Sequence, residues 1–264
     1  MMTSFNNQVV WITGASSGIG EALARELARH GARLVLSARN ADALGRVQAA
    51  CAPAEALVLP LDVSQPDQFA AAVAAVWARY GRLDLLINAG GISQRALALD
   101  TAPAVDRRLM EVNYFGTVGL TKAVLPRLLA QGSGRVVAIS SLVGKFGTPY
   151  RSAYAASKHA LHGFFDSLRA ELAGTGVGIT ILCPGFIHTN VSVNALAGDG
   201  QPLGTMDAAT AGGLAPAEFA RRAVRALARG VREANIGGRE TYGVLLKRWV
   251  PGLFARLLPR ARVR

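Results

Sequence analysis

The sequence predicts a single α/β domain in which a doubly wound parallel sheet carries helices on both faces. Short runs of Val, Ile and Leu alternate with longer amphipathic stretches along the first two thirds of the 264 residues. The short runs lack polar alternation, which is typical of strands covered on both faces. Strict alternation of strands and helices favours a parallel sheet. The apolar fraction of 51% provides a core and excludes a chain that is disordered throughout.

The elements follow one another in a regular order. Strands are expected at 8–13, 33–38, 56–59, 83–88, 135–140 and 178–183. Helices are expected at 18–30, 41–50, 66–80, 102–131, 152–173 and 216–229. Pro66 and Pro103 stand in first helical turns, where proline is tolerated, and Gly31, Gly81 and Gly174 follow helix ends. Residues 188–215 show weak periodicity, which predicts a functional lid or a disordered segment.

No linker or repeat divides the chain, so we expect one domain at 1–243, which includes a lid loop at about 188–215. Residues 244–264 form a basic, apolar C-terminal tail. Positive charge gathers towards this end, because residues 216–264 hold 12 basic and 3 acidic residues, whereas residues 1–215 hold 17 and 14. The net charge of +12 therefore describes the end of the chain, which argues against a nucleic-acid binder.

Compartment signals indicate a cytoplasmic protein. The longest apolar run spans ten residues, 69–78, which is too short to cross a bilayer. The first residues lack a basic segment followed by an apolar one, so we expect no secretory leader. Cys51 and Cys183 lack metal-ligand spacing and suit a reducing environment.

A glycine-rich turn joins the first expected strand to the first expected helix. Gly14 permits a tight exit from the strand, while Gly18 and Gly20 allow close approach of a pyrophosphate. The helix N-terminus adds free N–H groups and a positive dipole end. This placement predicts a Rossmann-type dinucleotide site, the alternative being a tight turn without a ligand. The candidate phosphate-binding residues are Gly14, Ser16, Ser17, Gly18, Ile19 and Gly20.

The end of the second strand favours NADP(H) over NAD. NAD-selective sites place a carboxylate there, but this chain has Arg39, whose planar guanidinium can pair with a 2′-phosphate. The alternative is an ordinary solvent-facing arginine in a chain that holds 25 of them. NADPH is therefore the expected cofactor, with NAD as the second choice.

The Gly-x-x-x-Gly-x-Gly spacing resembles that of the classical short-chain dehydrogenase/reductase family. The resemblance implies further cofactor contacts at the ends of later strands. Asp62 and Val63 would face the adenine, and Asn88, Ala89 and Gly90 would line the cleft. The segment from Pro184 to Thr189 matches the family's Pro-Gly-x-x-x-Thr, and Pro184, Gly185, Ile187 and Thr189 would hold the carboxamide.

Tyr154 and Lys158 stand four residues apart, so a helix projects both from one face. A phenol titrates near pH ~10, and a cation about 4–6 Å away would lower its pKa towards the range of a general base. Taken alone, this spacing has an alternative explanation, which is that a tyrosine and a lysine stand four residues apart on the surface by chance. The family resemblance implies that Ser141, rather than Ser140, orients the substrate oxygen. It also implies that Asn113 supports a water chain to Lys158, which completes a Ser-Tyr-Lys-Asn proton relay for hydride transfer.

The resemblance extends to the member 7/7B branch of the family, through residues 88–97, 100–126 and the tail. It implies a bulky, apolar ketone, aldehyde or alcohol as substrate. The expected substrate-binding residues are Ser141, Tyr154, Gln94 and Phe186, with Phe146, Tyr150 and Val191 as further pocket candidates. The alternative is that the apolar side chains among these residues only pack against their neighbours and do not contact a substrate. This chain departs from the branch in that we expect no amino-terminal membrane anchor.

The sequence leaves several alternatives open for the partners of this protein and for its function. The tail mixes basic and apolar residues, which suits an anionic membrane surface, docking over the substrate pocket, or packing against another subunit. The family commonly pairs helices like 102–131 and 152–173 into homodimers or homotetramers. His159 and His162 lack a completing ligand set, so we expect no metal. The alternative function is a non-catalytic dinucleotide sensor, but a sensor would not need proton-transfer groups.

Overall fold

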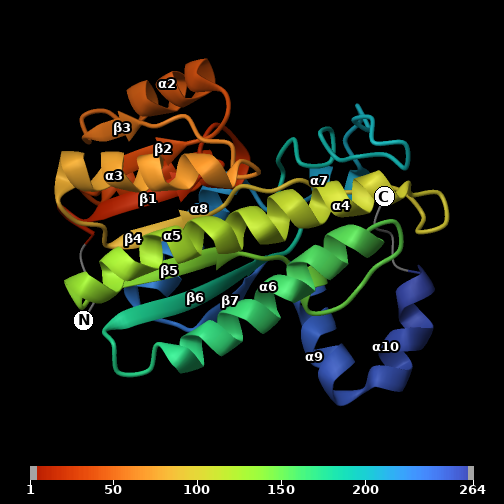
Figure 1. The fold of residues 1–264 in the computed structure, drawn as a ribbon. Coiled ribbons are helices and arrows are strands. Elements are labelled where there is room, and N and C mark those ends of the chain that lie inside the picture. The colour runs from red at the N-terminus through yellow and green to blue at the C-terminus, as the bar shows by residue number, and fades with distance from the viewer. Residues whose placement is uncertain (1–4, 261–264) are drawn as a thin grey trace.

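The computed structural model describes residues 5–260 and contains a seven-stranded, wholly parallel sheet (Figure 1). The predicted α/β class and doubly wound sheet are therefore confirmed. The strands Val9–Thr13 and Leu85–Asn88 are neighbours, and the strands that follow each of them in sequence are added on opposite sides of this pair. Open α/β sheets bind ligands at the carboxyl edge of such a switch point. In spatial order the strands are β3 (Ala56–Val58), β2 (Arg33–Ser37), β1 (Val9–Thr13), β4 (Leu85–Asn88), β5 (Gly134–Ile139), β6 (Val177–Pro184) and β7 (Glu233–Ile236).

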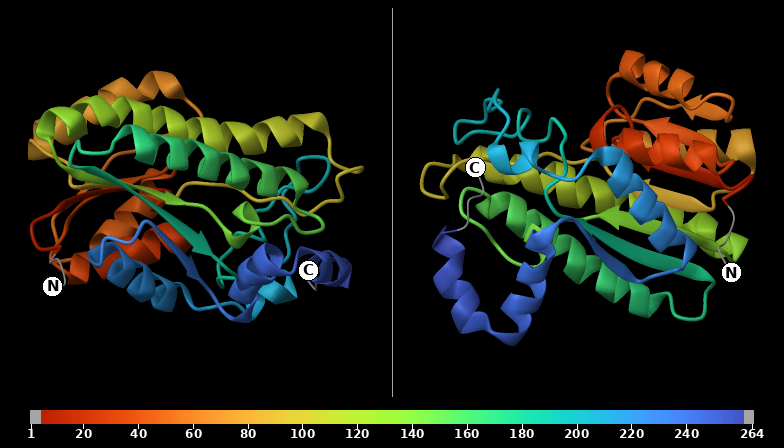
Figure 2. Two further views of the ribbon diagram at one scale, coloured as in Figure 1. Left: turned by 90° about the horizontal axis from the view of Figure 1, so that it is seen from below. Right: turned by 180° about the vertical axis from the view of Figure 1, so that it is seen from behind.

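Helices cover both faces of the sheet, as predicted (Figure 2). In β1, Val10 and Ile12 face one core, whereas Val9 and Trp11 face the other, so every position of the strand is buried. This double burial explains why the strands read as unbroken apolar runs. One face carries α1 (Gly18–Arg29), α2 (Ala41–Ala50) and α8 (Pro216–Ala228), and the other carries α3 (Phe69–Tyr80), α5 (Gly116–Gln131) and α6 (Ser152–Glu171).

The long helix expected at 102–131 is interrupted. It consists of α4 (Pro103–Met110), a π-helical turn (Glu111–Phe115) and α5. A π-helical turn adds one residue to a single turn, a local change that apolar periodicity over the whole helix does not reveal. Asn113 lies at the centre of this turn.

The C-terminal part contains elements that the sequence analysis missed. Strand β7 was not predicted, and the tail begins with two short helices, α9 (Tyr242–Trp249) and α10 (Pro251–Leu257), which lie near the start of α6 (Figure 1). The expected lid contains only one short helix, α7 (Ala208–Ala211). Short 3₁₀ turns occur at Pro66–Gln68, Leu142–Gly144, Arg239–Thr241 and Leu258–Arg260. Within residues 5–260, no helix combines the length and apolar character needed to cross a membrane.

Candidate active site

The glycine-rich turn between β1 and α1 (the glycine cradle) packs so closely against the backbone around it that a side chain at its glycines would clash. A Cβ on Gly14 would lie 2.7 Å from the Cα of Gly90, and one on Gly20 would lie 2.2 Å from the Gly14 carbonyl oxygen. Gly14 and Gly18 have φ of 65° and 58°, which favours glycine. The Ser17 side chain does not cap α1, so first-turn amides remain available to an anion. These features fit the pyrophosphate of a dinucleotide.

Two later segments meet this cradle. The Gly90 amide donates to Thr13 Oγ1 over 3.2 Å, which holds residues 88–90 beside the turn. A Cβ on Gly18 would lie 3.3 Å from Thr189 Cγ2, so the segment after β6 faces the cradle from the other side. Three strand ends that are far apart in sequence thus converge on one cleft.

Arg39 lies exposed just beyond β2. Burial acts to raise the pKa of Asp62, but hydrogen bonds from Ser64 and the charges of Arg39 and Arg108 hold it below its usual value. The carboxylate accepts from the Ser64 amide and hydroxyl at 2.9 and 2.7 Å. Arg39 therefore supplies positive charge to the end of the cleft where the sequence predicts the adenine ribose.

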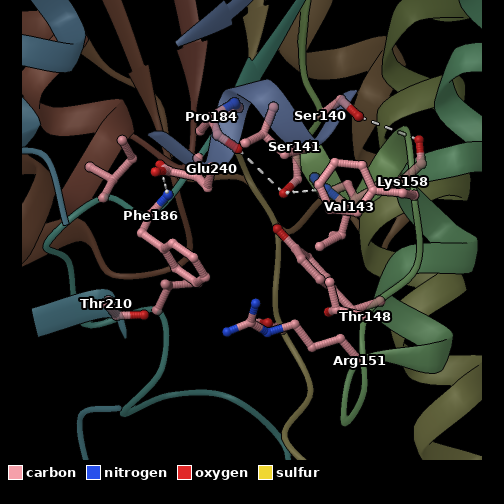
Figure 3. A pocket seen from close by; sticks show the side chains of 18 of the residues that line it. Ser140, Ser141, Val143, Thr148, Arg151, Lys158, Pro184, Phe186, Thr210 and Glu240 are labelled. Carbon is pink, nitrogen blue, oxygen red and sulfur yellow. Dashed lines mark hydrogen bonds between the residues drawn. The ribbon is translucent and has the colours of Figure 1, made fainter. Parts of the chain in front are cut away.

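A cavity of about 430 Å³ continues from the cleft along α6 (Figure 3). Its walls are mainly apolar, and the segment 184–187 forms one of them. Among the predicted site residues, it is lined by Ile19, Ala89, Ser141, Tyr154, Lys158, Pro184, Gly185, Phe186, Ile187 and Thr189, together with the pocket candidates Phe146 and Val191.

Tyr154 and Ser141 both line this cavity, where the Ser141 side chain acts on the phenol. Ser141 Oγ accepts from the Val143 amide at 3.3 Å and donates to the Pro184 carbonyl at 3.5 Å. Burial raises the pKa of the Tyr154 phenol, while the Ser141 hydrogen bond and the positive charges of Arg95 and Arg151 act to lower it. Ser140 instead points to His162, with 2.9 Å between Oγ and Nε2. The geometry thus distinguishes the two adjacent serines in favour of Ser141.

Lys158 lies beneath Tyr154 on α6, with its Nζ 5.8 Å from the centre of the phenol ring. The ammonium donates to the Ile139 carbonyl over 2.9 Å, and burial lowers the pKa of Lys158 to about 8. Lowering of the phenol pKa by Lys158 stays a prediction, while in this structure burial raises the pKa of Tyr154 and the charges of Arg95 and Arg151 act against that rise.

Asn113 is fully buried and joins the π-helical turn to the strand-exit segment after β4. Its Oδ1 accepts from the Ile92 amide at 2.9 Å, and its Nδ2 donates to the Ile92 carbonyl at 3.0 Å and to Ser157 Oγ at 2.9 Å. A Cβ on Gly91 would lie 3.0 Å from Asn113 Oδ1 and 3.5 Å from Lys158 Nζ. The absence of a side chain at Gly91 therefore leaves space where the two polar groups approach each other.

Gln94, expected to bind substrate, lies elsewhere. It is fully buried, and its Oε1 accepts from the Ala153 and Tyr154 amides at 3.0 and 3.4 Å, which places it behind the start of α6. Its neighbours Ser93 and Arg95 line the cavity instead. Tyr150 is likewise not among the lining residues.

Several polar residues around the cavity were not predicted from the sequence. Arg95 and Arg151 line it, and each is about 4% exposed. Glu240 lines it as well, and its carboxylate accepts from the Phe186 and Gly238 amides at 3.0 and 2.9 Å. Long-range contacts bring Arg95 and Glu240 to the site, whereas Arg151 stands only three residues before Tyr154 at the start of α6.

The tail, expected on a membrane surface, over the substrate pocket or against another subunit, contributes to the cavity wall. The residues concerned are Leu246 on α9, Phe254 and Leu257 on α10, and Leu258 just beyond α10. Two of the tail's basic residues, Arg262 and Arg264, lie outside the described residues.

Comparisons with known proteins agree with this geometry. The sequence profile of the family described as short chain dehydrogenase matches residues 8–199. A dehydrogenase/reductase SDR family protein 7-like of Anopheles gambiae is 48% identical over 238 residues, covering 88% of this chain and 75% of that protein. Dehydrogenase/reductase SDR family member 7B of Bos taurus is 43% identical over 272 residues, covering 99% and 84%.

Solved structures have a similar fold. A short-chain dehydrogenase from Streptomyces avermitilis has a TM-score of 0.80 at 31% identity, with 96% of both chains covered. A short-chain dehydrogenase/reductase from Burkholderia phymatum, solved in complex with NAD, has a TM-score of 0.83 at 26% identity, again with 96% of both chains covered.

Proposed function

The chain belongs to the short-chain dehydrogenase/reductase family of NAD(P)-dependent oxidoreductases, and we propose that it interconverts a carbonyl group and an alcohol on a bulky apolar substrate. One observation carries the proposal. The Tyr154–Ser141 pair and Lys158 line the same cavity as the segment 184–189 and open towards the glycine cradle. A cofactor in the cradle and a substrate in the cavity would therefore meet at Tyr154.

The chain's own groups would orient the substrate and move one proton. When bound, the nicotinamide supplies or accepts the hydride. The Ser141 hydroxyl would hold the substrate oxygen, and the Tyr154 hydroxyl would give that oxygen its proton during reduction, or take it during oxidation. Lys158 would hold the nicotinamide ribose and, with Asn113, return a proton to the phenol. A complete set of proton-transfer groups favours turnover over dinucleotide sensing.

We propose that NADPH is the preferred cofactor. Arg39 is exposed beyond β2, and its charge already reaches the carboxylate of Asp62 at the same end of the cleft. A guanidinium there would bind a 2′-phosphate through charge-assisted hydrogen bonds.

The cavity wall supports an apolar substrate. Phe146, Phe186 and Phe254 line it together with aliphatic side chains from the tail. Apolar walls with a few polar groups are typical of small-molecule sites. Carbonyl reduction of a bulky apolar ketone or aldehyde is the direction that NADPH favours.

We also propose two associations of the whole protein. The apolar side chains of Phe115, at the end of the π-helical turn, and Leu129, on α5, are 53% and 40% exposed. They support a homo-oligomer formed through this continuous helical region, and analytical ultracentrifugation measures the oligomeric state directly. The exposed faces of α9 and α10 support peripheral contact with an anionic membrane. The buried free cysteines Cys51 and Cys183 suit a cytoplasmic enzyme.

The decisive experiment follows cofactor absorbance with a panel of apolar ketones and aldehydes. Tyr154→Phe should lower kcat/KM about 1,000-fold, because the proton donor is removed while the ring remains. Tyr242→Phe removes an exposed phenol and is the matched control. Full ketone-reductase activity in Tyr154→Phe would contradict the proposal.

The same assay, run with NADPH and with NADH, tests the cofactor. Arg39→Ala should raise the KM for NADPH about tenfold or more, since a hydrogen bond to a charged group is lost, and should leave the KM for NADH unchanged. Equal effects on the two cofactors would refute a role for Arg39 in phosphate recognition.

A further inference from the structure

A buried cluster of three charged side chains borders the cavity. Arg95 Nε donates to Asp207 Oδ2 over 2.8 Å, and Arg151 Nη2 lies 3.8 Å from the same oxygen. All three side chains are 3–5% exposed. One carboxylate is therefore shared by two guanidinium groups in a site with little access to water.

The two arginines differ in how they are held. Arg95 Nη1 also donates to Ser93 Oγ and the Gln94 carbonyl at 2.7 and 2.8 Å, and Asp207 Oδ1 accepts from the Thr210 amide at 2.7 Å. Arg95 and Asp207 thus form a tightly bonded pair within the protein. Arg151 makes the longer contact to this pair, and its guanidinium lies 5.3 Å from the centre of the Phe186 ring.

The charge around the cavity is unbalanced. Of the ionisable side chains that line it, Arg95, Arg151 and Lys158 are cationic and Glu240 is anionic. With Asp207 behind the wall, this set carries one positive charge in excess. Burying a charge is costly unless an opposite charge accompanies it, so a bound anion would stabilise this arrangement.

The order of residues along α6 places this excess charge on the substrate side. Lys158 follows Tyr154 by one turn and donates to the end of β5, whereas Arg151 precedes Tyr154 by one turn at the start of the helix. Three residues of helix span about 4.5 Å. Figure 3 shows the Arg151 side chain extending into the cavity towards Phe186, on the side away from Lys158.

We propose that Arg151 binds a carboxylate of the substrate, so that the enzyme acts on apolar oxo acids or the corresponding hydroxy acids. The inference rests on the proposed function and adds the substrate class. Because Arg151 and Tyr154 are one helical turn apart, we expect the carboxylate to lie only a few bonds from the reacting carbon. The apolar remainder would extend towards Phe146 and the tail helices, and the carboxylate itself would take no part in the reaction.

The charge and shape of the site favour a carboxylate over a phosphate. One excess positive charge matches a monoanion, whereas a phosphate monoester carries nearly two negative charges at neutral pH. The planar guanidinium matches a planar carboxylate through two parallel N–H···O bonds. The Phe186 ring lies beside this guanidinium, with 5.3 Å between the ring centre and the Cζ of Arg151.

Binding without turnover tests the carboxylate site directly. Calorimetry in the presence of NADP should show dodecanoate binding about tenfold to 100-fold more tightly than methyl dodecanoate, as expected for hydrogen bonds to a charged group. Arg151→Gln should abolish the difference, and Arg151→Lys should retain part of it. Arg46→Gln, on the exposed face of α2, is the control for removing one positive charge. Equal affinities of acid and ester for the wild-type protein would overturn the proposal without any variant.

Turnover supplies the second readout. The ratio of kcat/KM for 4-oxododecanoate to that for its methyl ester should exceed about 10 in the wild type and approach 1 in Arg151→Gln. Any general loss of turnover cancels in this ratio. If both compounds turn over equally, the carboxylate site is wrong although the oxidoreductase stands. If dodecanoate binds selectively but no carbonyl compound is reduced, the proposed function fails although the site stands.

Discussion

At the scale of single residues, Tyr154 shows how burial and charge oppose each other on one phenol. Burial raises its pKa, which keeps the proton in place, and the Ser141 hydrogen bond with the charges of Arg95 and Arg151 acts to lower it. A neutral phenol whose anion is stabilised nearby can both give and take a proton near neutral pH. In the proposed reaction the arginines would therefore act from the substrate side and Lys158 from the cofactor side.

The burial of His162 predicts that the free energy of unfolding decreases in acid. This histidine is 8% exposed, and burial together with the charge of Lys145 lowers the pKa of His162 to about 4. Because this lies below the usual 6.5, the unfolded chain binds more protons between pH 4 and 6.5, and stability falls as the pH drops through that window. We expect His162 to account for about 2 kcal/mol of the free energy of unfolding lost between about pH 7.5 and about pH 5.

Urea denaturation at these two pH values measures the effect. His162→Gln should lose less stability on acidification than the wild type, by roughly the amount given above, whereas the exposed His188→Gln should behave like the wild type. The same acid-induced loss in all three proteins would show that His162 does not titrate in this way.

The site was predictable where its residues are close in sequence or stand at strand ends. The spacing of Ser141, Tyr154 and Lys158 points to one helix and the strand before it, and the structure brings all three to one cavity. Arg95 and Asp207 are 112 residues apart, so no local pattern could pair them. Gln94 was placed in the pocket because it is near the site in sequence. It lies instead behind α6, while its neighbours on either side line the cavity.

At the scale of elements, the helical region from α4 to α5 combines a π-helical turn with very close packing against the sheet edge. Asn113 is held within that turn, and Gly116 opens α5 immediately after it. A Cβ on Gly116 would lie 2.5 Å from the Val63 carbonyl oxygen, so the helix touches the backbone of the segment after β3. The glycine therefore sets how closely α5, and with it Asn113, approaches the cofactor cleft.

Replacing a glycine inside a helix by alanine usually stabilises a protein, but we expect the close packing at Gly116 to reverse this effect. Gly163→Ala, at an exposed site in α6 with no atom within 4 Å of the added Cβ, should stabilise the protein by about 0.5–1 kcal/mol. Gly116→Ala should destabilise it by about 1–3 kcal/mol, because backbone atoms must move. Chemical denaturation of both variants provides the comparison, and stabilisation by Gly116→Ala would refute the close contact.

The elements that were not predicted have local sequences that give little indication of their secondary structure or of the side that is buried. Strand β7 has only four residues, Glu-Ala-Asn-Ile, and lies at the sheet edge, where one side lacks a neighbouring strand. Its pairing with β6, not its composition, makes it a strand. The tail helices have apolar residues on two sides, and the sequence could not decide which side faces the cavity. Strands in the centre of the sheet were predictable because burial on both faces leaves an unbroken apolar run.

At the scale of the whole molecule, the tail joins the substrate cavity to an exposed apolar and basic surface. Leu246, Phe254 and Leu257 face the cavity. Trp249 and Leu253, 74% and 45% exposed, face outward on the same two helices, with Lys247, Arg248, Arg256 and Arg260 close in sequence. If α9 and α10 lay on a lipid bilayer, an apolar substrate dissolved in that bilayer would reach the cavity past these two helices.

This arrangement predicts that the protein binds vesicles that contain anionic lipid. Basic residues contribute about 1 kcal/mol each near an anionic surface, and buried apolar side chains add to this. Cosedimentation with phosphatidylserine vesicles should therefore fall about fivefold in Arg248→Ser, and further in the double variant Trp249→Ser with Leu253→Ser. None of these side chains lines the cavity, so reduction of a water-soluble aldehyde should continue in every variant. Binding should weaken in high salt and with uncharged phosphatidylcholine vesicles, because screening and loss of surface charge remove the same attraction. A wild-type protein that stays in the supernatant with anionic vesicles at low salt would exclude the membrane surface as a partner.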